Sequence, residues 1–186
     1  MILISHPAVC AAARLIYRLY REEFSNRVLL DFDPYGPEPT LPEPESIDEG
    51  LFVVNTNWTY DPEAYSDLLS NNKAAAYYGR KEGIASIHRG SAVGLYHVGV
   101  GVIAIGTVTS ACCRAIHDDV PDAEFFVQCH FDYKVDPKAE PDRAVKAWEI
   151  NERFKTGHRF RQTVFTLPAA YASFIREKFQ ERTNTR

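Results

Sequence analysis

The sequence predicts an α+β domain built on a small, mostly antiparallel β-barrel with helices at its margins. Residues 84–109 contain two apolar stretches joined by a tight turn, in which Gly99 can adopt the positive φ that such turns require. The second of these strands is apolar on both faces, which indicates that both faces are covered. Residues 123–135 alternate between apolar and polar side chains, as in a long strand with one solvated face.

The strand period assigns side chains to faces. In the second hairpin strand we expect one face to carry Val100, Val102, Ala104 and Val108, and the other Ile103 and Ile105. In the long strand the apolar face is expected to hold Phe125, Val127, Cys129, Phe131, Tyr133 and Val135, opposite a polar face of Glu124, Gln128, His130, Asp132 and Lys134.

Residues 1–48 are expected to stand outside this domain. Apolar residues at helical spacing predict a helix over 7–24, in which Pro7 suits a first turn. The following stretch, 34–45, alternates prolines with acidic residues, a pattern typical of an extended connector because dense proline prevents both helix and ladder pairing. We therefore predict a helix and connector over 1–48 and the barrel domain over 49–186.

The remaining elements of the barrel domain follow in chain order. Asp61 is a good capping residue and Pro62 suits the first turn of the helix that follows it. We expect a strand over 51–55, a helix over 62–69, one helical turn at 84–90, weak helix over 144–154, a strand over 160–167 and a last helix from 168.

Composition narrows the class of protein. The chain has 186 residues, enough to bury a core, and is 45% hydrophobic and 25% charged, which is ordinary for a soluble globular protein. No apolar run approaches the roughly 20 residues of a membrane span, so we expect no membrane association. The start of the chain has no basic region typical of a secretion signal, and the four cysteines show no CxxC spacing. We expect reduced thiols and a cytoplasmic protein.

Charge is unevenly distributed along the chain, although its net value is −4. Residues 31–67 contain ten acidic residues and no lysine or arginine, whereas residues 143–186 contain ten basic residues against four acidic ones. This basic C-terminal segment, 143–186, permits a polyanionic partner without requiring one.

Several motifs together resemble the EVE-type domains of the PUA-like superfamily over about residues 51–182. They are Asn55-Thr56-Asn57-Trp58 at a strand end, Ala76-Tyr77-Tyr78-Gly79, the spacing of Ile84, Ile87, Gly90, Val93, Leu95 and Tyr96, the run from Val100 to Val108, and Phe160 to Leu167 as a closing strand. The resemblance implies a PUA-like pseudobarrel that binds nucleic acid, including a modified base, in a pocket beside the first strand. This chain departs from the pattern in having Ser91 after Gly90, and Tyr77 or Tyr78 where a tryptophan is common.

The candidate pocket needs ring faces for stacking and amide or hydroxyl groups to read a base edge. The residue types that meet this need are Asn55, Asn57, Trp58, Tyr77, Tyr78 and Tyr96, all near strand ends or loops of the predicted barrel. The alternative for the rings is plain core packing with satisfied polar tips. Phosphate contacts are expected from Arg80, Lys81, Arg159 and Arg161, for which the alternative is solvated surface charge.

No complete set of acid, base and nucleophile is evident, so no catalytic residue is assigned. No metal-ligand spacing and no nucleotide-binding loop occurs, so neither metal nor cofactor is expected. The leading interpretation is a module that binds DNA or RNA. Two alternatives remain open: a structural or protein-interaction protein, with residues 1–48 contacting a partner, and a small hydrolase using His130 and Asp132, which share a strand face.

Overall fold

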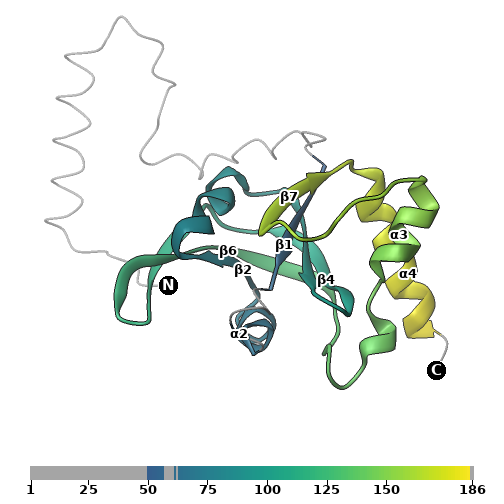
Figure 1. Cartoon of the computed structure of the whole chain (residues 1–186), viewed down its shortest axis with the longest axis horizontal. Helices are drawn as coiled ribbons and strands as arrows, with labels where there is room; N and C mark the ends of the chain where they lie inside the picture. Colours follow the sequence, from purple (N-terminus) through teal and green to yellow (C-terminus); the bar gives the residue numbers. More distant parts are fainter. Residues whose placement is uncertain (1–49, 57–60, 62, 185–186) are drawn as a thin grey trace, which may run out of the picture. The chain divides into compact units, whose positions relative to one another are not determined.

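In a computed structural model of the whole chain, the structure describes residues 50–56, 61 and 63–184 (Figure 1). The predicted helix over 7–24, the proline-rich connector and the boundary at 48/49 lie outside the described residues and stay predictions, as does cytoplasmic localisation.

The described residues form a seven-stranded sheet in the order β2-β6-β4-β3-β1-β7, with β5 also paired to β6. Its strands are β1 (Leu51–Asn55), β2 (Lys73–Tyr77), β3 (Ala92–His97), β4 (Gly101–Val108), β5 (Cys113–His117), β6 (Val120–Lys134) and β7 (Val164–Leu167). Only β1 and β3 are parallel among these pairs. The sheet is curled and mixed, and helices flank it, which confirms the predicted α+β class.

Three α-helices and two 3₁₀ segments accompany the described strands. They are α2 (Ala64–Ser70), α3 (Ala147–Phe154), α4 (Ala170–Asn184), η1 (Tyr78–Ser86) and η2 (Pro141–Arg143). Figure 1 shows α3 and α4 together beyond one side of the sheet, with α2 below it. The backbone N–H of Glu63 donates to Asp61 Oδ1 at 2.9 Å, but the N-cap of α2 is Glu63 and the helix begins at Ala64, two residues later than expected.

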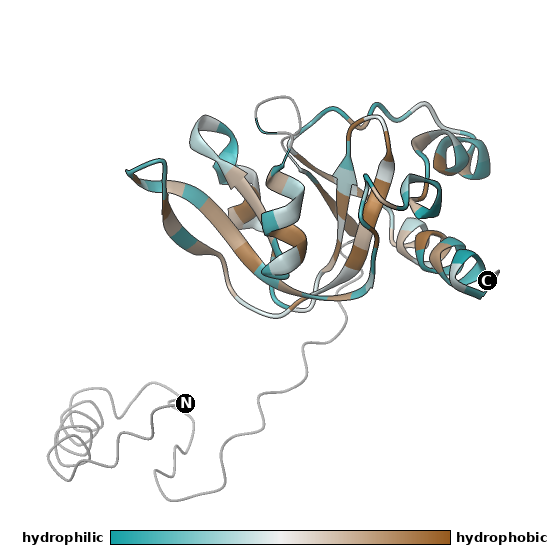
Figure 2. Cartoon of the chain, turned by 90° about the horizontal axis from the view of Figure 1, so that it is seen from below, coloured by the Kyte–Doolittle hydropathy of each residue, from teal (hydrophilic) through white to brown (hydrophobic). Residues whose placement is uncertain are grey.

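Both faces of the sheet are covered by hydrophobic cores. The first core joins α2 and η1 to the sheet through residues such as Leu68, Ile84 and Val54, and the second joins α3 and α4 to it through residues such as Ile175 and Val53. Successive residues of β1 therefore enter different cores, and all five are buried. Hydrophobic residues accordingly dominate the strands in Figure 2.

The predicted hairpin is confirmed as β3 and β4. The turn is closed by Val100 N–H donating to His97 O at 3.1 Å, and Gly99 has φ +80°. All residues of β4 except Thr107 are buried, which confirms that both faces are covered.

The predicted face assignment within β4 is partly wrong because the pairing with β3 contains a bulge. The register passes from Leu95–Ala104 to Tyr96–Val102, which leaves Ile103 as an extra residue. Val102 therefore joins the second core and Ile103 the first, the reverse of what strict alternation predicts.

The long predicted strand is confirmed as β6, which pairs with β2, β4 and β5. A second bulge leaves Asp132 unpaired between Phe131 and Tyr133, so Tyr133 packs with the second core and Phe131 lies in the first. Glu124, expected on the wet face, is 5% exposed and forms a 2.6 Å ion pair with Lys73.

Two strands were not predicted. The Ala-rich β2 has no apolar–polar alternation, and β5 carries only half-buried and exposed side chains, so neither shows a strand period. The turn after β5 consists of Asp118 and Asp119, with φ +49° and +60°, which is typical of a two-residue type I′ hairpin. The remaining elements differ mainly in their ends: β7 begins at Val164 and not at Phe160, and α3 at Ala147.

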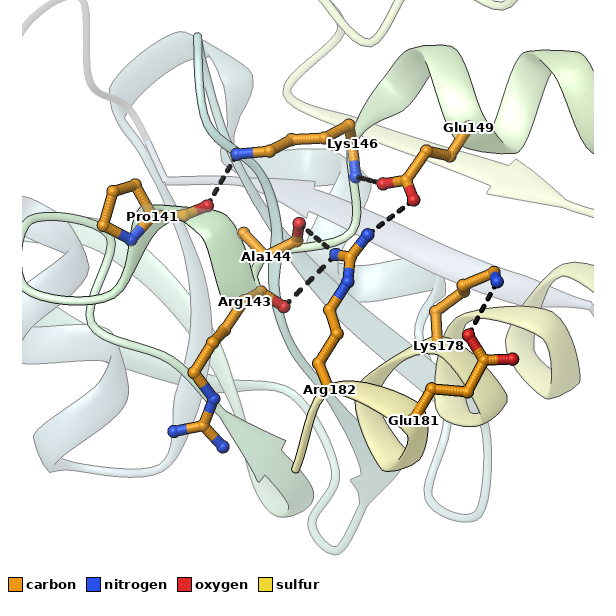
Figure 3. A network of polar contacts seen from close by, with 8 residues as sticks. All are labelled: Pro141, Arg143, Ala144, Lys146, Glu149, Lys178, Glu181 and Arg182. Carbon is orange, nitrogen blue, oxygen red and sulfur yellow. Dashed lines mark hydrogen bonds and ion pairs between the residues drawn. The ribbon is translucent and has the colours of Figure 1, made fainter. Parts of the chain in front are cut away.

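Arg182 near the end of α4 fastens this helix to the start of α3 (Figure 3). Its guanidinium donates to Ala144 O and to Glu149 Oε1, each at 2.5 Å. Glu149 Oε2 in turn accepts the backbone N–H of Lys146 at 2.8 Å, which caps α3. Among the described residues, no helix combines the length and the apolar character needed to cross a membrane.

Candidate functional site

A pocket of about 420 Å³ lies where the end of β1 meets the junction of β2 with η1. Its volume is within the range of small-molecule sites. The lining residues are Asn55, Ala75, Ala76, Tyr77, Tyr78, Gly79, Arg80 and Thr163. The structure therefore brings together four of the predicted site residues: Asn55, Tyr77, Tyr78 and Arg80.

Asn55 is positioned by the last rung of the sheet. Its backbone N–H donates to Thr163 O at 2.8 Å, and its side-chain Nδ2 reaches Phe160 O at 3.5 Å, the long limit of a hydrogen bond. A carboxamide has two donor hydrogens and two acceptor lone pairs, so this one long contact leaves it capacity for a ligand.

Tyr77 forms a buried wall of the pocket. Its side chain is part of the first core, and burial raises the pKa of its phenol, so the group stays neutral at physiological pH. Its ring lies against the imidazole of His117, with centroids 4.3 Å apart and planes at 35°.

Tyr78 is the exposed ring of the pocket, with 46% of its surface accessible. Its backbone φ is +52°, an unusual value for a bulky residue. Its hydroxyl donates to Asp118 Oδ2 at 2.6 Å, and this hydrogen bond raises the pKa of the phenol. A half-exposed ring at a pocket mouth has surface available for stacking.

Of the two predicted cations on η1, only Arg80 lines the pocket, and it is exposed. The Lys81 ammonium donates to the backbone carbonyl of Asp122 and lies 4.8 Å from the centroid of the Phe125 ring. Lys81 therefore connects η1 to β6 beside the pocket and is not among the residues that line it.

Tyr96 does not line the pocket. It is 8% exposed, and its ring stacks on that of Phe160 in the second core with centroids 4.9 Å apart. Its position is therefore that of a core residue, which is the alternative interpretation given for the aromatic rings. Arg159 and Arg161 are exposed in the segment before β7 and are also outside the lining. Asn57 and Trp58 lie outside the described residues, and their predicted roles stay predictions.

Thr163 is the polar lining residue that sequence reasoning missed. In β7, Val164 pairs with Val54 of β1, so the preceding residue comes opposite Asn55. The sequence predicts both the first strand and the closing strand. Thr163 could have been found only if the register of their antiparallel pairing had also been assigned, because that register places Thr163 opposite Asn55.

A buried polar pair lies at the adjoining ends of β1 and β3. Thr56 Oγ1 and His97 Nδ1 are 2.8 Å apart, and the His97 ring meets Tyr65 edge-on at 5.2 Å. Burial lowers the pKa of His97, so its imidazole is neutral at physiological pH. This hydrogen bond satisfies two buried groups next to the pocket end of β1.

Of the two residues of the hydrolase alternative, His130 and Asp132, the carboxylate of Asp132 is paired with an arginine. Asp132 Oδ2 accepts from Arg176 Nε at 2.9 Å, and among the described residues no contact joins Asp132 to His130. Within the same described part of the chain, no group of three or more His, Cys, Asp or Glu side chains is arranged to hold a metal ion.

Comparison with known proteins gives structural neighbours only. No family model and no curated protein matches the chain. A hypothetical protein from Leishmania major is 12% identical with a TM-score of 0.48, covering 74% of this chain and 99% of that one. The YTH domain-containing protein mmi1, in complex with RNA, is 11% identical with a TM-score of 0.49, covering 73% and 86%.

A third neighbour is the YTH domain of Zygosaccharomyces rouxii MRB1 protein in complex with N6-methyladenosine RNA. It is 12% identical with a TM-score of 0.45, and the match covers 80% of this chain and 93% of that one. The resemblance to EVE-type domains stays a prediction from the sequence motifs.

Proposed function

We propose that this chain is a nucleic-acid-binding module whose pocket accepts one unstacked base, and that the base is a modified one. The observation that carries the proposal is the convergence of two tyrosine rings, a carboxamide and a guanidinium on one pocket of about 420 Å³. Rings supply stacking surfaces, the carboxamide can bond a base edge, and the guanidinium can contact a phosphate.

The chemistry of the pocket favours a flat, largely neutral ligand. Stacking on an aromatic side chain contributes about 1–3 kcal/mol per base. Extruding a base costs a few kcal/mol, and this cost is least where the strand is already single. A pocket with one exposed ring and one carboxamide is therefore expected to prefer single-stranded DNA or RNA.

A modified base would gain from the apolar part of the lining. Ala75 and Ala76 are buried apolar residues of the lining, so a methyl substituent on a base would find an apolar neighbour in the pocket. Burying one methyl contributes about 0.8 kcal/mol, or roughly fourfold in affinity.

The test is a titration of the full chain with single-stranded DNA and RNA oligonucleotides that differ by one methylated base. Tyr78→Ala is expected to weaken binding about 5-fold to 150-fold, the equivalent of 1–3 kcal/mol, because it removes the exposed stacking surface. The control is Trp148→Ala, which removes another exposed ring, on α3 and outside the pocket lining. Absence of binding by the wild type, or equal binding by wild type and Tyr78→Ala, would contradict the proposal.

The interaction alternative through residues 1–48 concerns a part of the chain outside the described residues and stays a prediction. Comparing the oligonucleotide affinity of the full chain with that of a variant lacking 1–48 shows whether these residues contribute to oligonucleotide binding, since the described lining residues of the pocket come from 55–163.

A further inference from the structure

We propose that the tip of the β5–β6 hairpin is the positioning element of the pocket, with Asp118 holding the Tyr78 ring in its stacking orientation. This inference rests on the proposed function and names the residue through which selectivity for the base is set. No residue of the hairpin tip is among the pocket lining, so Asp118 acts through Tyr78 and not on a ligand.

Tyr78 needs an external support to keep one orientation. Its side chain is half-exposed, so packing alone restricts it weakly, and its φ of +52° is costly for a residue with a large side chain. A conformation of this kind persists only where the surroundings determine it, and such positions are concentrated at binding sites.

Asp118 supplies that support. The hydrogen bond from the Tyr78 hydroxyl to Asp118 Oδ2 is 2.6 Å long, so the side chain of residue 118 fixes the position of the far end of the ring. Asp118 belongs to a two-residue turn in which both residues have positive φ, so its own backbone is confined by the hairpin.

His117 adds a second contact between hairpin and pocket. Its ring approaches Tyr77 at 4.3 Å and Tyr78 edge-on at 5.7 Å, and its Nε2 is 3.6 Å from Asp118 Oδ2. The hairpin tip therefore contacts both pocket tyrosines from outside the lining.

The hairpin is also fixed to η1 beyond its tip. Lys81 of η1 donates to the backbone carbonyl of Asp122, and the ring of Phe125 has the cations of Lys81 and Arg114 at 4.8 and 4.9 Å from its centroid. Because η1 begins at Tyr78, these contacts fix the position of the hairpin relative to the start of η1.

This arrangement makes an acceptor at position 118, and not a negative charge, the requirement for positioning. Asp118→Ala should weaken binding of the preferred oligonucleotide about 5-fold to 10-fold without changing its salt dependence, whereas Asp118→Asn should bind nearly as the wild type does. Tyr78→Phe removes the same hydrogen bond from the other side while keeping the ring, so it should match Asp118→Ala.

The experiment is a double-mutant cycle on oligonucleotide affinity with Tyr78→Phe, Asp118→Ala and the pair. The expected result is that the double variant binds no more weakly than either single variant. Asp119→Ala is the matched control, since Asp119 occupies the same turn with φ +60° and, among the described residues, no hydrogen bond joins it to Tyr78. Additive effects, or equal losses in Asp118→Ala and Asp119→Ala, would overturn the positioning role.

A readout without ligand separates this inference from the proposed function. The phenol pKa of Tyr78, followed by NMR of ring-labelled tyrosine with Tyr78→Phe for assignment, should fall toward its ordinary value in Asp118→Ala, which loses both the hydrogen bond and the carboxylate, and should fall less in Asp118→Asn, which keeps the hydrogen bond. A wild type that binds no oligonucleotide contradicts the proposed function. A wild type that binds, with unchanged affinity in Asp118→Ala, overturns the positioning role alone.

Discussion

At the scale of single residues, two glycines of the β3–β4 hairpin show how different demands produce the same residue type. A Cβ on Gly106 would lie 1.9 Å from the backbone oxygen of His130, whereas a Cβ on Gly99 would meet nothing within 4 Å. Gly99 is required only by its φ of +80°. We expect Gly99→Ala to lower the free energy of unfolding by about 1 kcal/mol, the cost of a left-handed conformation.

Gly106→Ala should cost more, about 3 kcal/mol or above, because strand β6 would have to move away from β4. Urea denaturation of the two variants measures the difference. Equal losses would show that the close approach of the two strands at Gly106 is absent in solution. The tight turn at Gly99 could be predicted from the sequence, but the backbone contact at Gly106 depends on the pairing of β4 with β6, which no local pattern encodes.

Some of the site residues could likewise be identified from local sequence, whereas others depend on contacts between distant parts of the chain. Asn55, Tyr77, Tyr78 and Arg80 could be named as candidates because they carry the residue types that a base requires, and all four line one pocket. Tyr96 could not be assigned, since whether it enters the pocket or the second core depends on the bulge at Leu95/Tyr96. Asp118 could not be identified from the sequence, because its contact to Tyr78 spans 40 residues.

At the scale of elements, the junction of α3 and α4 depends on one arginine (Figure 3). Arg182→Ala would remove charge-assisted hydrogen bonds to Ala144 O and Glu149, and the Glu149 side chain is only 14% exposed. Hydrogen bonds to charged groups contribute about 1.5–3 kcal/mol, so we expect a loss of about 2 kcal/mol in the free energy of unfolding.

Lys178→Ala is the control for this helix. Lys178 forms an i,i+3 pair with Glu181, a half-exposed partner, and surface pairs of this kind contribute about 0–1 kcal/mol. Urea denaturation of both variants compares them. A loss in Lys178→Ala as large as in Arg182→Ala would mean that general helix propensity, and not the junction, explains the effect.

Elements with a clear period were predicted well and those without one were missed. The buried strand β1, the hairpin β3–β4 and the alternating β6 follow from their patterns. The Ala-rich β2 and the exposed β5 exist because β6 offers them pairing partners. Their stability is tertiary, so the local sequence does not specify them.

At the scale of the whole molecule, sequence-independent affinity for the strand and selectivity for one base are expected to reside in different parts of the chain. The pocket lies at the end of β1, whereas the exposed Arg159 and Arg161 lie outside its lining, in the basic C-terminal segment 143–186. Backbone phosphates repeat along every strand regardless of sequence, so contacts to them strengthen binding of all oligonucleotides equally. Each phosphate contact also contributes about 0.7 to the slope of log affinity against log salt for a single strand.

Replacing both arginines by glutamine should therefore lower that slope by about 1.4 and weaken methylated and unmodified oligonucleotides by the same factor. Tyr78→Ala, in contrast, should change the ratio of the affinities for the methylated and the unmodified oligonucleotide and leave the salt slope unaltered. Arg153→Gln with Lys155→Gln controls for net charge, because these residues are exposed in the same third of the chain on and after α3. If both double variants lower the slope equally, the effect comes from the net charge of the protein and not from contacts of Arg159 and Arg161. If the Arg159/Arg161 double variant leaves the slope unchanged, these two side chains are solvated surface charges.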